Sequence, residues 1–101
     1  MGNAGGGCPW ALQTVGALPS TGTTAAHNAI MPFYQDMNPN ISADGDIQYQ
    51  TIGTAPNRMF VVLYREIGQF QCGPTECNYA GIILYETSND IEVHIGKKTI
   101  C

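Results

Sequence analysis

The stretch RMFVVLYREI (residues 58–67) decides the fold of this chain. It is a short continuous apolar run, rich in β-branched and aromatic side chains, which is typical of a strand. The loop-forming sequence GTAPN (residues 53–57) precedes it. Because it is the most apolar of the expected strands, we place it at the centre of a sheet.

Further strands are expected on both sides of this central one. IQYQTI alternates Ile47, Tyr49 and Thr51 with polar partners, which is the period of a half-buried strand. It follows the turn signal Asp44-Gly45, and we expect it to form a hairpin with the aromatic stretch NAIMPFYQDM. The expected strands are residues 28–37, 47–52, 58–67, 79–87 and 90–95, with room for a short strand at 11–15.

The last expected strand shows that the sheet has one dry face. Ile91, Val93 and Ile95 point to one side, and the acids and His94 between them point to the other. We therefore predict an all-β domain at residues 11–101, an antiparallel β-sandwich or meander with no helix, after a glycine-rich segment at residues 1–10. Nothing obvious in the sequence covers the dry face, so we expect the sheet to be incomplete or to be completed by a neighbouring subunit.

Composition excludes two classes of function. The 101 residues suffice for one small domain, and only 12% are charged, against roughly 25% in an average soluble domain. The net charge is −4, and the few basic residues never cluster beyond a pair, which disfavours nucleic-acid binding. No apolar run approaches the roughly 20 residues that span a bilayer, so we expect no membrane insertion.

The four cysteines point to an oxidising, extracellular or cell-surface location. Disulfides are the favoured reading of an even set in a short chain, with a zinc site or free thiols as alternatives. Four cysteines allow three sets of two disulfides, and all three sets are open. Among the individual bonds, Cys72–Cys101, Cys77–Cys101 and the loop closure Cys72–Cys77 are each sterically sensible. The cysteines are Cys8, Cys72, Cys77 and Cys101.

One loop has the composition of a calcium site. In DMNPNISADGD (residues 36–46), carboxylate and amide side chains stand at alternate positions, as at the start of a calcium loop. Ile41 takes the place of the glycine of such loops, and Asp and Asn are also the usual residues of plain turns, which is the favoured reading. The candidate calcium ligands are Asp36, Asn38, Asn40, Asp44 and Asp46.

No residues suggest catalysis. His94 can pair with Glu92 or Asp90 on an exposed strand face, and His27 falls in a loop, so we expect both histidines to be solvated. Trp10 could stack on a sugar or on an aromatic side chain of a partner, although covering the core beside a disulfide is the favoured reading. We therefore assign no catalytic residue and no cofactor other than the candidate calcium.

Most of the chain resembles a module of large secreted Bacteroidetes proteins, through AIMPFYQDMNP, IQYQTIGTAPNRMFVVLY, FQC and IILYETSNDIEVHIGKKTIC. Those proteins carry immunoglobulin-like or PKD-type repeats and a sorting domain of the gliding-motility, type IX secretion kind, and the module is similar to the extracellular domain of nidogen. The resemblance implies that this chain corresponds to the middle of a domain.

The expected function is that of a non-catalytic structural or adhesive module of a secreted or cell-surface bacterial protein. Its partners would be further copies of the chain, in a homo-oligomer built by strand complementation, or neighbouring domains of a parent protein. The alternative is a calcium-dependent module that binds glycans or proteins.

Overall fold

The computed structural model describes residues 29–100. Residues 29–36 belong to one unit, Met1–Asp36, and residues 37–100 belong to a second, Met37–Cys101. Within residues 29–36 of the first unit the backbone is irregular, with bends at positions 32 and 35. The strand predicted for residues 28–37 is therefore wrong over these positions. Pro32 offers no backbone N–H to a ladder, which accounts for part of the failure.

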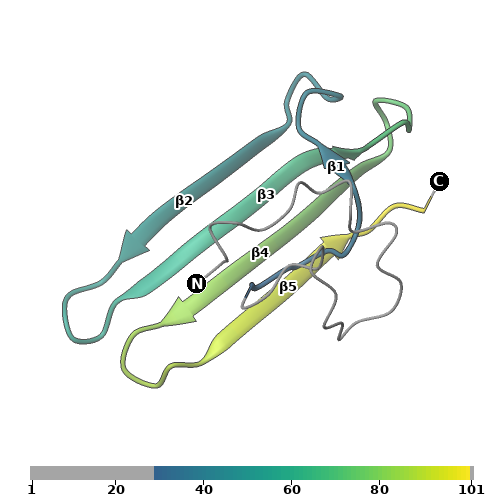
Figure 1. The fold of residues 1–101 in the computed structure, drawn as a ribbon. Coiled ribbons are helices and arrows are strands. Elements are labelled where there is room, and N and C mark those ends of the chain that lie inside the picture. The colour runs from purple at the N-terminus through teal and green to yellow at the C-terminus, as the bar shows by residue number, and fades with distance from the viewer. Residues whose placement is uncertain (1–28, 101) are drawn as a thin grey trace. The chain divides into compact units, whose positions relative to one another are not determined.

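The second unit is an antiparallel sheet, so the all-β prediction is confirmed. Four long strands lie side by side in chain order as a meander (Figure 1). A short fifth strand pairs with one end of the second long strand. Within the described residues there is no helix, and therefore none that could cross a membrane. The strands are β1 (Met37–Asn38), β2 (Asp46–Ile52), β3 (Met59–Gln69), β4 (Cys77–Tyr85) and β5 (Ile91–Lys97).

The central strand is β3, as its sequence predicted, because it pairs with β2 and β1 on one side and with β4 on the other. β1 does not form the predicted hairpin with β2. Instead Met37 and Asn38 pair with Gln69 and Gly68 at the far end of β3. β1 and β2 therefore follow one another along the same side of β3.

The loop between β1 and β2 folds against the end of β3, and two glycines permit this close approach. A Cβ on Gly68 would lie 2.7 Å from the Cβ of Ile41, and one on Gly45 would lie 2.5 Å from the carbonyl oxygen of Pro39. Ile41 therefore packs on Gly68, which explains an apolar residue in this polar loop.

A β-bulge interrupts the pairing of β3 with β4. Tyr64 pairs with Ala80 and Ile67 with Asn78, so two residues of β3 stand opposite one of β4. Glu66, within the bulge, has a φ of 52°. The extra residue returns Ile67 to the same face of the sheet as Tyr64, where Ile67 is only 1% exposed.

The register places most of the large apolar residues of β2 to β5 in one layer, which we call the apolar face. Others lie on the opposite face, namely Ile52, Met59, Val61, Leu63 and Ile83. Directly paired residues of an antiparallel sheet share a face, and alternate residues of a strand share a face. The apolar face consists of Ile47, Tyr49, Thr51, Phe60, Val62, Tyr64, Ala80, Ile82, Leu84, Ile91, Val93 and Ile95. The prediction that Ile91, Val93 and Ile95 share one face of the last strand is confirmed.

Candidate functional site

The two outer strands, β2 and β5, carry the most exposed part of the apolar face. Ala80 and Ile82 on β4 are buried, whereas Tyr49 on β2 is 76% exposed and Ile91 and Ile95 on β5 are 55% and 54% exposed. Exposed apolar side chains gathered in this way mark surfaces that contact other molecules. The outer strands are therefore the candidate functional site.

An ion pair ties the loop before β3 to the end of β4. The Arg58 guanidinium donates through Nε to Oε2 of Glu86 at 2.8 Å and through Nη2 to Oε1 at 2.5 Å, and the Arg58 backbone N–H donates to Oε2 at 3.1 Å. The hydrogen bond from the Arg58 side chain is the largest cause that lowers the pKa of Glu86 to about 2. The same bond raises the pKa of Arg58.

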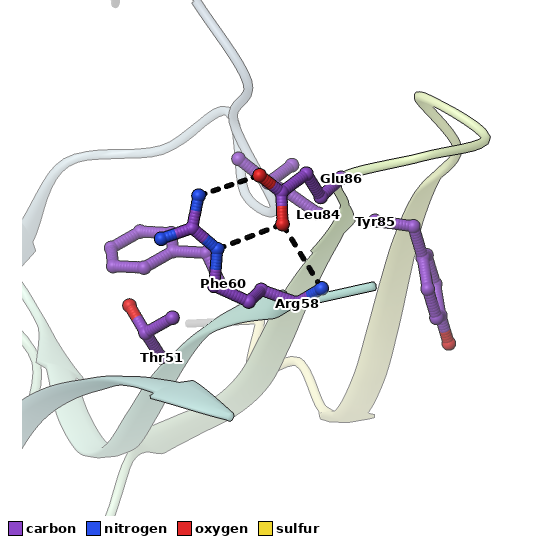
Figure 2. A pocket seen from close by; sticks show the side chains of 6 residues that line it. All are labelled: Thr51, Arg58, Phe60, Leu84, Tyr85 and Glu86. Carbon is purple, nitrogen blue, oxygen red and sulfur yellow. Dashed lines mark hydrogen bonds and ion pairs between the residues drawn. The ribbon is translucent and has the colours of Figure 1, made fainter. Parts of the chain in front are cut away.

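A shallow hollow of about 300 Å³ lies beside this ion pair at the end of the apolar face. Figure 2 shows the Glu86 carboxylate turned toward the Arg58 guanidinium, next to Phe60 and Leu84, while the Tyr85 ring points away. Because Nε and Nη2 of Arg58 bind both carboxylate oxygens of Glu86, the pair holds the start of β3 and the end of β4 together.

On the opposite face, β4 and β5 are joined by a small polar cluster. Glu92 accepts a hydrogen bond from the Tyr85 hydroxyl at 3.1 Å and lies 2.9 Å from His94 Nε2. The bond with His94, followed by that with Tyr85, lowers the pKa of Glu92. The predicted pairing of His94 with Glu92 on an exposed face is confirmed. The cluster places the Glu92 carboxylate on the outer strand β5.

The loop with the candidate calcium ligands uses several of its polar atoms internally. Asn38 Oδ1 accepts from the Asn40 backbone N–H at 2.9 Å, and Asp46 Oδ2 accepts from Gln48 Nε2 at 2.6 Å. The Asp44 backbone N–H donates to Ser42 Oγ at 3.3 Å.

Asp36 belongs to the first unit and is described apart from this loop. Among the described residues, no three His, Cys, Asp or Glu side chains gather in a group that could hold a metal ion. Calcium binding, for which asparagine oxygens also count, stays a prediction.

The described cysteines differ from each other. Cys72 is disulfide-bonded, whereas Cys77 is a free, buried thiol whose Sγ lies 3.1 Å from the carbonyl oxygen of Pro74. The prediction that Cys77 is part of a disulfide is therefore wrong, and neither the Cys72–Cys77 loop closure nor a Cys77–Cys101 bond is present. Cys8 and Cys101, like Trp10 and His27, lie outside the described residues, and the predictions on them stay predictions.

A buried asparagine that the sequence did not reveal fixes the chain beyond β5. Asn78 is fully buried, and its Nδ2 donates to the Ile67 carbonyl oxygen at 3.0 Å. Its Oδ1 accepts from the backbone N–H of Thr99 at 2.9 Å and from the Thr99 hydroxyl at 3.2 Å. The position of Asn78 near the start of an apolar strand was the available signal, because a polar residue there needs partners.

Comparison with known proteins gives one match. A family model described as NIDO related matches residues 11–100, which is most of the chain. No curated protein and no solved structure matches.

Proposed function

The chain belongs to the NIDO-related family, and we propose from this membership that it is a non-catalytic structural module working outside the cell. The sequence resemblance to secreted surface proteins supports a bacterial secreted or cell-surface parent protein. Within that setting the module is adhesive, and it joins neighbouring domains or further copies of the chain through its sheet.

The observation that carries the adhesive role is the exposure of the outer strands. Tyr49 on β2 and Ile91 and Ile95 on β5 are each more than half exposed, although they continue a face on which Ala80 and Ile82 are buried. Burying apolar surface on association stabilises a complex by about 25 cal/mol per Å² before the costs of association. A surface of this kind is suited to protein contacts.

The sheet edges support strand addition as the way of joining. The outer strand of an antiparallel sheet directs the backbone N–H and C=O of alternate residues away from the sheet. Another strand can pair with these groups, which gives affinity through main-chain hydrogen bonds.

Antibody labelling of the source cells tests the location. We expect antibodies raised against the chain to bind intact cells, or to recover the protein from the medium. Binding only after the cells are permeabilised would refute an extracellular role.

Bead aggregation tests the adhesive role. Beads coated with the purified chain should clump with one another more than beads coated with a heat-denatured sample. Equal clumping of both bead types would contradict specific adhesion by the folded sheet.

A further inference from the structure

We propose that β2 is a self-pairing edge, at which two copies of this chain join their sheets antiparallel about a two-fold axis. The inference rests on the proposed adhesive function and names its partner, a second copy, and its site, residues 46–52. It depends on three observations, which are the open geometry of β2, the absence of charge from residues 47–52 and the complementarity of β2 with itself.

The geometry of β2 leaves its outer edge open. Within residues 29–100, β2 pairs with β3 and with no other strand, and its seven residues pair one by one without a bulge, from Asp46 with Arg65 to Ile52 with Met59. β1 pairs with β3 further along, so it does not lie outside β2 (Figure 1). Residues 47–52 are all exposed. A second strand can therefore reach this edge along its whole length.

After Asp46, its first residue, β2 lacks the usual defences of an edge strand. Sheet edges are normally protected from pairing by charged side chains, proline or a bulge. IQYQTI has none of these, and its β-branched and aromatic residues favour strand pairing. The opposite edge has two such defences, because β5 carries Glu92 and Lys97 and bulges at Gly96.

Pairing of two β2 strands about an axis at Tyr49 gives a consistent set of opposite residues. Tyr49 stands opposite Tyr49 of the second copy, Gln48 opposite Gln50, Ile47 opposite Thr51 and Asp46 opposite Ile52. No two like charges face each other, and aromatic and β-branched pairs stabilise antiparallel strands.

The two-fold arrangement also continues the apolar face from one copy to the next. Opposite residues share a face, so Ile47 and Tyr49 of both copies lie on the same side of the joined sheet. A two-fold contact is closed, because the β2 edge of each copy is used once. The product is therefore a discrete dimer.

Two double variants test both the edge and the register. Gln48→Lys with Gln50→Lys places lysines opposite lysines at two positions of the interface, and we expect the dimer dissociation constant to rise about tenfold. Gln48→Glu with Gln50→Lys places acids opposite lysines at the same positions, and we expect dimerisation to be kept or strengthened. The matched control on the other edge is His94→Lys, which should leave dimerisation unchanged.

Sedimentation of the full chain up to about 1 mM measures all four proteins, with circular dichroism as the check on folding. A dimer in the wild type and in the Glu/Lys variant, together with a weakened Lys/Lys variant, supports the proposal. A monomeric wild type, open-ended polymers, or equal behaviour of the two double variants would overturn it. Labelling of intact cells does not depend on dimerisation, so failure of this inference is distinguishable from failure of the proposed location.

Discussion

The two outer strands, β2 and β5, are equally exposed but are built in opposite ways. β2 is uncharged from Ile47 to Ile52 and pairs regularly with β3, whereas β5 carries Glu92, His94 and Lys97 and bulges at Gly96. Beyond β5, the buried bonds between Asn78 and Thr99 fix the chain to the sheet. The difference teaches that one edge of the same sheet can be closed to pairing by charge and shape while the other stays open.

The largest effect should come from Asn78, which fixes the chain beyond the protected edge. Asn78→Ala removes the partners of the Ile67 carbonyl and of the Thr99 N–H and hydroxyl, all in a buried place. We expect a loss of about 3 kcal/mol in the free energy of unfolding. Urea denaturation measures this loss, and hydrogen exchange should show β5 losing more protection than β2.

Thr99→Val is the matched control for this prediction. It removes the hydroxyl but keeps the backbone N–H that donates to Asn78, so we expect a loss of about 1 kcal/mol. If Asn78→Ala is no more destabilising than Thr99→Val, the buried amide does not hold the β5 side of the sheet.

Removing the charges of β5 should abolish the difference between the edges. Glu92→Thr with His94→Thr leaves β5 with residues that favour strands and without its central charges. A β5 edge can then pair with the β2 edge of another copy, and such a head-to-tail contact propagates. We expect species larger than a dimer in size-exclusion chromatography at concentrations where the wild type shows none.

The control places the same residues on the other edge. Gln48→Thr with Gln50→Thr adds no charge to β2 and should leave the association state as it is in the wild type. An unchanged elution of the β5 variant would show that its charges do not protect that edge.

Acid should weaken the sheet through two carboxylates. The pKa of Glu86 is about 2, below its ordinary value of 4.5, and that of Glu92 is also lowered. A carboxylate with a lowered pKa in the folded state contributes stability above its ordinary pKa, and this stability is lost as the pH falls through the folded value. For Glu86 the window runs from about 4.5 down to about 2.

Glu86→Gln is the variant that isolates this effect. We expect it to be less stable than the wild type at neutral pH, and the difference to shrink across the window as the wild-type carboxylate is protonated. Melting temperatures at a series of pH values measure the difference. A constant difference down to pH of about 2 would mean that the ion pair with Arg58 adds nothing that depends on charge.

The sequence predicted the long strands well because each has a local pattern. RMFVVLYREI marked the central β3, and alternation in DIEVHI marked the faces of β5. The failure at residues 28–37 came from reading aromatic composition as a strand despite Pro32. The pairing of β1 with the end of β3 could not be foreseen, because it depends on Ile41 packing against Gly68, a contact between distant positions.

The candidate site was only partly accessible from the sequence. The pairing of His94 with Glu92 followed from their alternate positions on one strand, but the ion pair between Arg58 and Glu86 joins residues far apart in the chain. Composition did show that residues 47–52 lack charge. What it could not show is that β2 lies at an edge, since that depends on which strands pair.

The smallest expected effect concerns calcium, and it separates a structural module from the calcium-dependent alternative. Asn38 Oδ1 accepts from Asn40 within the loop, Asp46 Oδ2 accepts from Gln48 of β2, and Ile41 packs on Gly68, so the loop is held without an ion. We therefore expect millimolar calcium to leave the melting temperature unchanged, and Asp44→Asn to make no difference to that result. A ligand that binds the folded state at 100 times its dissociation constant adds about 2.7 kcal/mol, which a thermal melt readily detects. An increase that calcium causes, magnesium does not, and Asp44→Asn abolishes would show that the loop is a calcium site after all.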